Sequence, residues 1–262
     1  MFRSDYDSDI SIWSPQGRIH QIEYAMEAVK QGSASVGLKS KTHAVVAAVK
    51  RASSELGSNQ QKVFRIDDHL AISMSGLTAD GRVLTKYLRN ECLNHKFVYE
   101  QPMPVSKLVV QLADKSQVHT QQSGRRPYGV GLLVIGYDEN GPHLYETSPS
   151  GNYYDYKAQA IGNRFQSART YLEKTYETFD DATPEELIRH SLLALRETVQ
   201  TSSSSSSSTP NEGITSKNAV VAIVGRDQKL TIYENEELIP FLAGIETSGA
   251  AAGENTATSM EE

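Results

Sequence analysis

The first regular pattern in the chain is helical and covers residues 18–31. Its apolar positions recur every three or four residues, so that a helix would place them on one face: Ile19, Ile22, Met26 and Val29. Gly32 follows as a natural helix end. Proline and glycine within residues 14–17 are typical of a turn. The sequence therefore predicts a turn followed by an amphipathic helix.

After Gly32 the pattern changes to short apolar runs separated by turn residues, which is typical of β-strands. The run over 43–49 is almost continuously apolar, as expected of a strand covered on both faces. The first four strands are expected to form an antiparallel meander: 33–39, 43–49, 63–66 and 70–75. Further strands are expected at 128–137, 143–147, 151–160, 220–224 and 230–233. Helices are expected at 78–98, 104–120, 165–177, 184–199 and 235–243.

Strands and helices occur in blocks, and this order decides the fold class. Strict alternation would indicate a parallel, doubly wound sheet. Blocks of strands followed by helices favour an α+β fold, in which two antiparallel sheets pack face to face and a helical layer covers each outer side. We therefore expect a four-layer αββα sandwich that forms a single domain over residues 1–245.

Two polar segments fall outside this pattern. Ser202–Ser208 is a run of seven serines. Such a run cannot bury apolar area, so we expect a flexible loop over 201–213. The end of the chain, 246–262, is small, polar and acidic, and we expect a disordered tail there.

The composition argues against several classes of function. The net charge is −6 at pH 7, which gives no electrostatic support for binding nucleic acid. No stretch approaches the ~20 apolar residues that cross a bilayer, and residues 1–30 lack the apolar core of a secretory signal. We expect no nucleic-acid partner, no membrane, and a location in the cytoplasm and nucleus. The single cysteine, Cys92, is interpreted as an apolar filler on a helix.

The motifs of common enzymes are missing from the sequence. The seven histidines show no ligand spacing, so no metal site is expected. Gly129-Val130-Gly131 lacks the third glycine of a dinucleotide loop, and neither a phosphate-binding loop nor a Gly-x-Ser-x-Gly elbow occurs. Adjacent carboxylates such as Asp67-Asp68 fit turns better than acid–base catalysis. We expect no cofactor.

The N-terminal segment carries a more informative pattern than the motifs of common enzymes. Tyr6-Asp7, the run from Trp13 to Arg18 and the run from Gln21 to Ala25 resemble the signature of proteasome alpha-type subunits. The resemblance continues at these positions: 30–33, 36–37, 49–51, Lys62, 75–80 and 125–131. It extends over about residues 2–245. It implies the N-terminal-nucleophile hydrolase fold, in which two antiparallel sheets lie between two helical layers, and the order of elements agrees with that fold.

The resemblance also implies an assembly and a role. Seven different alpha subunits form each outer ring of the four-ring core particle, and beta subunits form the inner rings. The implied partners are the other alpha subunits of a seven-membered ring, the beta subunits of the adjacent ring, and regulatory ATPases or other activators that dock through their C-termini. The implied role is structural and gating, in ubiquitin-dependent and other protein degradation.

A catalytic alternative has to be weighed against this role. Catalytic relatives use the first residue of the mature chain as nucleophile and its free amine as base. Gly32-Ser33 stands at the matching place, and Lys62 matches the active-site lysine. Three features oppose cleavage. Serine replaces threonine, Val49 stands where a carboxylate would pair with the lysine, and cleavage would discard the predicted helix. We expect no catalytic residue, with a peptidase that uses Ser33 as the alternative.

The resemblance assigns the N-terminus to a gate. Tyr6, Asp7, Pro15 and Tyr24 match the cluster that holds the open state of the axial pore. A Tyr hydroxyl and an Asp carboxylate can hydrogen-bond across neighbouring subunits. Residues 1–17 are therefore expected to form the gate tail and turn, and 18–31 the helix that packs within the alpha ring.

A second set of residues matches the pocket between adjacent alpha subunits that receives the C-termini of activators. The set comprises Lys62, Gly76 and Leu77. A lysine ammonium can pair with a terminal carboxylate, and the pair gains strength when it is partly desolvated. Gly76 would permit close approach of the backbone.

Overall fold

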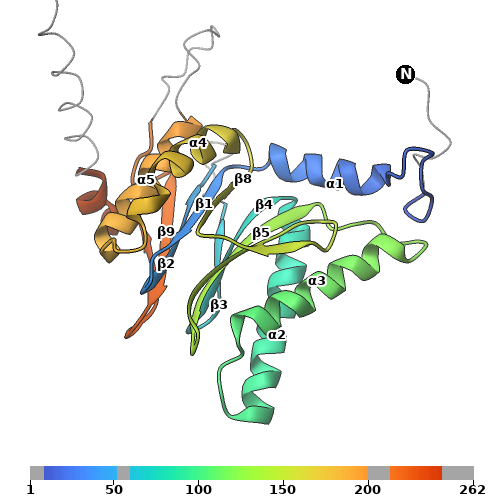
Figure 1. The fold of residues 1–262 in the computed structure, drawn as a ribbon, viewed down its shortest axis with the longest axis horizontal. Coiled ribbons are helices and arrows are strands. Elements are labelled where there is room, and N and C mark those ends of the chain that lie inside the picture. Colours follow the sequence, from blue (N-terminus) through green and yellow to red (C-terminus); the bar gives the residue numbers. More distant parts are fainter. Residues whose placement is uncertain (1–8, 52–59, 200–212, 244–262) are drawn as a thin grey trace, which may run out of the picture.

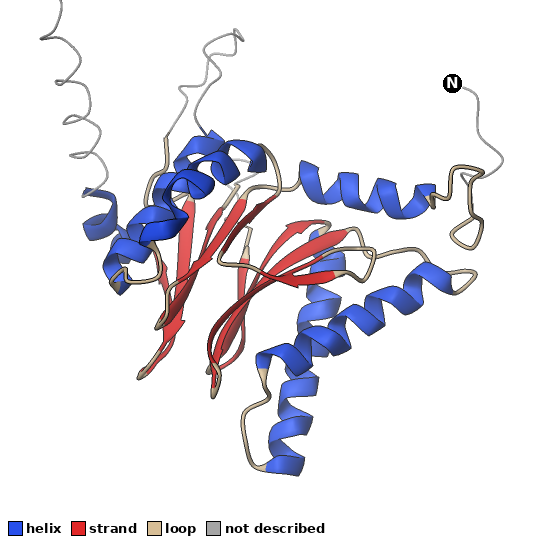
Figure 2. Ribbon diagram, viewed as in Figure 1, coloured by secondary structure: helices blue, strands red, loops and turns tan. Residues whose placement is uncertain are grey.

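The computed structural model describes residues 9–51, 60–199 and 213–243 (Figure 1). Two five-stranded antiparallel sheets lie at its centre, and pairs of helices lie on their outer sides (Figure 2). The predicted α+β sandwich of four layers is confirmed. Residues 1–8, 201–212 and 246–262, which include Tyr6, Asp7, most of the predicted serine-rich loop and the predicted acidic tail, lie outside the described residues.

The first sheet has the strand order β10-β9-β2-β1-β8. Its strands are β1 (Ser35–Lys39), β2 (His43–Val49), β8 (Ala158–Ile161), β9 (Ala219–Gly225) and β10 (Gln228–Glu234). β2 and β9 pair along their whole length in the middle of the sheet. Both are buried over most of their length, because one face meets the second sheet and the other meets helices. This double coverage explains their near-continuous apolar sequence.

The second sheet has the strand order β3-β4-β5-β6-β7. Its strands are β3 (Val63–Asp67), β4 (Leu70–Gly76), β5 (Val130–Asp138), β6 (Gly141–Thr147) and β7 (Tyr153–Asp155). The first four strands therefore form two hairpins in different sheets, and the predicted single meander is wrong. The physical reason is that β2 has β1 on one side and β9 on the other, which leaves no free edge for β3.

The predicted strand over 151–160 is divided between the two sheets. The Tyr156 amide donates to the carbonyl of Leu144 in β6 (2.9 Å), which keeps it in the second sheet. The next residue, Lys157, accepts from the amide of Lys39 in β1 (2.9 Å), which belongs to the first sheet. The chain thus crosses between the sheets at 156–157, ending β7 and beginning β8.

The outer layers are two helix pairs. α2 (Thr78–Tyr99) and α3 (Val105–Gln121) cover the second sheet, and α4 (Phe165–Thr175) and α5 (Pro184–Val199) cover the first (Figure 1). Short 3-10 helices, η1 (Tyr176–Thr178) and η2 (Asn235–Leu238), replace the end of one predicted helix and the start of another. Thr183 and Glu186 form a reciprocal capping box at the start of α5.

Three apolar clusters hold these layers together. One lies between the two sheets and includes Val46, Leu133 and Leu144. The other two lie between each sheet and its helices, under α4 and α5 or under α2 and α3. Cys92 is buried in the cluster under α2, and burial raises the pKa of its thiol to about 12. Such a thiol is a packing group and not a nucleophile.

The helix α1 (His20–Gln31) stands apart from the two pairs. It runs across one end of the sandwich and contacts β4 and β5 (Figure 1). Ala25 is its buried residue, whereas Met26 is 41 % exposed. The apolar face of α1 is therefore only partly covered by its own chain.

Candidate functional site

The three residues predicted to form an activator pocket lie at the open end of the β3–β4 hairpin. Lys62 directly precedes β3, and its carbonyl accepts a hydrogen bond from the amide of Met74 in β4 (3.2 Å). Gly76 is the last residue of β4, and Leu77 is the N-cap residue of α2. The antiparallel register therefore brings Lys62, Gly76 and Leu77 to the same end of the second sheet, where β3 begins and β4 ends.

Lys62 is an unusual lysine because it is only 4 % exposed. Burial, and to a smaller extent the charge of Arg51, lower the pKa of its ammonium to about 8. No ion pair within residues 9–51, 60–199 and 213–243 involves Lys62. Lys50, the other buried lysine, instead pairs with Glu234 at 3.3 Å. The Lys62 ammonium can therefore gain strongly from a carboxylate that reaches it.

At Gly76 two backbone segments approach each other closely, as the sequence predicted. Its φ is +115°, and a Cβ at this position would lie 2.2 Å from the carbonyl oxygen of Gly129. The amide of Leu77 donates to that same oxygen at 2.8 Å. The Leu77 side chain is 49 % exposed and offers an apolar surface beside the hairpin end. A side chain at Gly76 would push these two segments apart.

Of the four predicted gate residues, the structure describes Pro15 and Tyr24. Pro15 is exposed and lies within a closed turn, in which the Gly17 amide donates to the Ser14 carbonyl (2.9 Å) and the Ser14 amide to the Arg18 carbonyl (2.8 Å). Tyr24 is 51 % exposed on α1, and its ring stacks on His20. The predicted turn is confirmed. The contacts of Tyr6 and Asp7 lie outside the described residues.

Ser33, the candidate nucleophile of the catalytic alternative, lies in a tight junction between α1 and β1. It is 6 % exposed. The Ser75 hydroxyl bonds to the carbonyl oxygens of Val29 (2.9 Å) and Ser33 (3.2 Å). A Cβ on Gly32 would lie 2.3 Å from the amide nitrogen of Gly76, so only glycine fits there. The junction joins α1 firmly to the end of β4.

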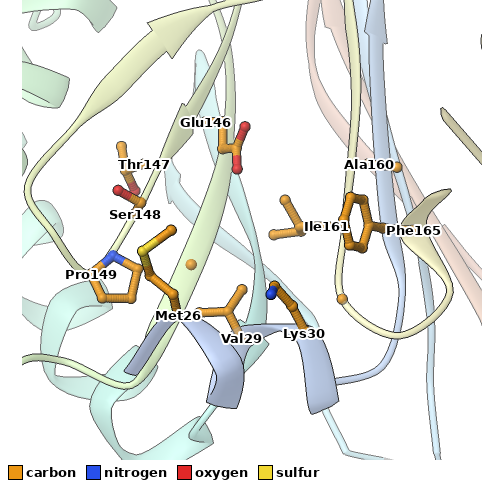
Figure 3. A pocket seen from close by; sticks show the side chains of 12 residues that line it. Met26, Val29, Lys30, Glu146, Thr147, Ser148, Pro149, Ala160, Ile161 and Phe165 are labelled. Atoms are coloured by element: carbon orange, nitrogen blue, oxygen red, sulfur yellow. The ribbon is translucent and has the colours of Figure 1, made fainter. Parts of the chain in front are cut away.

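A pocket of about 170 Å³ lies under α1, between the ends of the two sheets (Figure 3). Met26, Val29 and Lys30 of α1 line one side, and Glu146 of β6 extends toward it (Figure 3). Burial raises the pKa of the Glu146 carboxyl, although Gln159 donates a hydrogen bond to it at 2.6 Å. Ser33 does not line this pocket. Sequence reasoning missed Glu146, because alternation in a strand gives no sign of its burial.

A second feature that the sequence did not reveal is an ion pair next to the predicted pocket. The Arg126 guanidinium makes a bidentate contact with the Asp80 carboxylate at 2.6 and 2.8 Å. Arg126 therefore has its anionic partner within the same chain. The two partners are 46 positions apart, so no local pattern links them.

Two kinds of feature are absent from residues 9–51, 60–199 and 213–243. No group of three or more His, Cys, Asp or Glu side chains in these ranges could hold a metal ion. Among the same residues, no helix has the length and apolar character needed to cross a bilayer.

The fold and this arrangement define a two-sheet sandwich of the N-terminal-nucleophile type, with an extra helix across one end. Family comparison is specific. The proteasome subunit family matches residues 29–210, and the N-terminal signature of the alpha-type members of that family matches residues 6–28. The chain belongs to the proteasome subunit family and carries the alpha-type signature.

Similar proteins cover nearly the whole chain. The alpha type-1 proteasome subunit of Dictyostelium discoideum is 56 % identical over 94 % of this chain and 96 % of its own length. The alpha type-1 proteasome subunit of Drosophila melanogaster is 52 % identical over 90 % of this chain and 83 % of its own length. The alpha type-6 proteasome subunit of Saccharomyces cerevisiae is 46 % identical over 92 % of this chain and 100 % of its own length. The start Met1-Phe2-Arg3 and the run 19–28 also resemble the alpha type-1 branch.

Proposed function

We propose that this chain is a non-catalytic subunit of the outer alpha ring of the proteasome core particle, where it controls substrate entry and helps to dock regulatory particles. The observation that carries the non-catalytic role is the junction between α1 and β1. An amine on Ser33 would require removal of α1, which covers the end of the sandwich and is fixed to it through Gly32 and Ser75.

The residues at the positions of the expected carboxylate and lysine also argue against catalysis. Val49, at the place of the expected carboxylate, is an apolar residue of β2 whose amide bonds to the Ala34 carbonyl at 3.0 Å. Burial, not a partner charge, dominates the pKa of Lys62. These residues therefore lack the charge arrangement that would tune a terminal amine. The alternative peptidase that uses Ser33 is correspondingly disfavoured.

The gating role rests on the N-terminal segment. The alpha-type signature includes Tyr6, Asp7, Pro15 and Tyr24. Pro15 lies in a rigid, exposed turn directly before α1, so this turn can aim the preceding tail. We propose that the tail blocks an axial pore and that these four residues form the contacts of its open state with neighbouring subunits.

The docking role rests on the end of the second sheet that carries Lys62, Gly76 and Leu77. A buried ammonium without a carboxylate partner among the described residues, next to a partly exposed leucine, suits a C-terminal carboxylate that follows apolar residues. We propose that the C-termini of regulatory ATPases or other activators bind here, in a pocket completed by an adjacent alpha subunit.

Large apolar side chains on the outside of α2 support assembly. Leu93 is 67 % exposed, Phe97 86 % and Val98 66 %. Such a group is costly in a free chain and is typical of a surface that a partner covers. We propose the other alpha subunits of a seven-membered ring and the beta subunits of the adjacent ring as partners, and a location in the cytoplasm and the nucleus.

Affinity purification of the tagged native chain, with sedimentation and identification of the co-purifying chains, tests this function. We expect a large particle that contains other alpha and beta subunits, and imaging of the same tagged chain should place it in the cytoplasm and nucleus. A stable monomer that carries neither kind of subunit would contradict the proposal.

A further inference from the structure

The Asp80 carboxylate lies next to the predicted activator pocket and is almost fully buried, at 7 % exposed. It makes three hydrogen bonds. Two come from the Arg126 guanidinium, at 2.6 and 2.8 Å, and the third comes from the amide of Gly129, at 2.9 Å. The Arg126 guanidinium, with help from this amide, holds the pKa of Asp80 below its usual range. Asp80 is therefore charged and fixed at neutral pH.

The backbone of Gly129, whose amide donates to Asp80, contacts three segments of the chain. Its carbonyl oxygen accepts from the Leu77 amide at 2.8 Å and occupies the space that a Cβ on Gly76 would need. A Cβ on Gly129 itself would lie 2.8 Å from the Leu77 side chain and 3.8 Å from Ala28 of α1. The amide of Gly129 thus faces Asp80, and its carbonyl group faces Gly76 and Leu77.

We infer that Asp80 and Arg126 are positioning residues of the activator pocket, because they hold the amide of Gly129, and the carbonyl group of the same residue sets the places of Gly76 and Leu77. This inference rests on the proposed docking role. Neither side chain needs to touch the activator tail. Loss of the ion pair frees Gly129 to move, and the pocket wall then loses its shape while Lys62 keeps its charge.

Site-specific cross-linking to purified particles tests this inference. The probe is a short synthetic peptide with the C-terminal sequence of a regulatory ATPase that co-purifies with the particle, a free carboxylate and a photoreactive group. The amidated form of the same peptide is the control for the carboxylate. The yield of cross-links to this chain is measured against peptide concentration, together with particle assembly and thermal stability.

Asp80→Asn should raise the half-saturating peptide concentration about tenfold, because the charged hydrogen bonds between a buried carboxylate and the largely exposed Arg126 are lost. Arg126→Lys keeps the charge but not the bidentate geometry, and should give a smaller loss. The matched control is Glu173→Gln, which removes the exposed Arg169–Glu173 ion pair on α4. It should leave the half-saturating peptide concentration unchanged. In a Lys62→Ala background, the effect of Asp80→Asn should largely disappear, because both act on one pocket.

The outcomes separate this inference from the proposed function. If Lys62→Ala raises the half-saturating peptide concentration while assembled Asp80→Asn particles bind as the wild type does, only the positioning role is overturned. If Lys62→Ala itself leaves cross-linking unchanged, the result contradicts the proposed docking site and also the positioning role that depends on it. If Asp80→Asn prevents assembly, Arg126→Lys decides the matter, and wild-type affinity in assembled Arg126→Lys particles overturns the inference.

Discussion

At the scale of the residue, Lys62 should make the proposed docking of activator tails dependent on pH. Its pKa of about 8 means that the ammonium loses its proton as the pH rises above that value. A carboxylate binds only the charged form, so affinity for an activator tail should fall between about pH 7 and 9, approaching tenfold for each unit above the pKa. Tail cross-linking across this range measures the effect.

Lys62→Arg supplies the matched comparison, because the guanidinium stays charged over the whole range. Its tail affinity should therefore be nearly constant with pH, even if the larger side chain binds less tightly at pH 7. The same fall in both proteins would show that another group is responsible.

Gly76 provides a second test at this scale. Gly76→Ala should lower the free energy of unfolding by about 2–4 kcal/mol, because a Cβ collides with the Gly129 carbonyl in addition to the strain of a positive φ. Gly124→Ala is the matched control: φ is +80°, but no atom lies within 4 Å of the new Cβ. It should cost only about 1 kcal/mol. Denaturant unfolding of both variants measures the difference, and equal losses would count against the collision.

At the scale of the element, the turn at Pro15 and α1 connect the proposed gate tail to the sandwich. Removal of residues 1–9 spares Ile10, which is 5 % exposed, and leaves the turn at Pro15 intact. Peptide hydrolysis by particles without an activator should rise severalfold, because the tail no longer obstructs the pore. Hydrolysis with saturating activator should stay the same. Unchanged basal hydrolysis in fully assembled particles would argue against a blocking role for this tail.

Elements with a local cause could be predicted from the sequence. α1 follows from the spacing of Ile22, Met26 and Val29, and α5 begins where Thr183 and Glu186 form the expected cap. The division of 151–160 between two sheets could not be predicted. Strand patterns record whether a residue is covered, and they do not record which sheet supplies its partners.

In the candidate site, too, local features could be predicted from the sequence and contacts between distant segments could not. Lys62, Gly76 and Leu77 were assigned by family resemblance, and the register of one local hairpin then brings them together. The burial of Lys62 and the pairing of Asp80 with Arg126 depend on segments far apart in the chain. Such contacts leave no periodic signal in a single sequence, so only the folded structure reveals them.

At the scale of the whole molecule, the chain has the sandwich of a hydrolase family but keeps a helix across the end where a processed chain would expose its new N-terminus. α1 contacts β4 and β5, and the Gly32–Ser33 segment is wedged against Ser75 and Gly76. Loss of α1 would uncover this end of the sandwich. An intact chain is therefore part of the proposed role as a ring and gate component.

The intact mass of this chain, isolated from assembled particles, tests that role most directly. We expect a mass that includes the bond between Gly32 and Ser33, and therefore α1, in every particle. A chain that begins at Ser33 would contradict the account, because it would carry the free amine that a catalytic subunit requires.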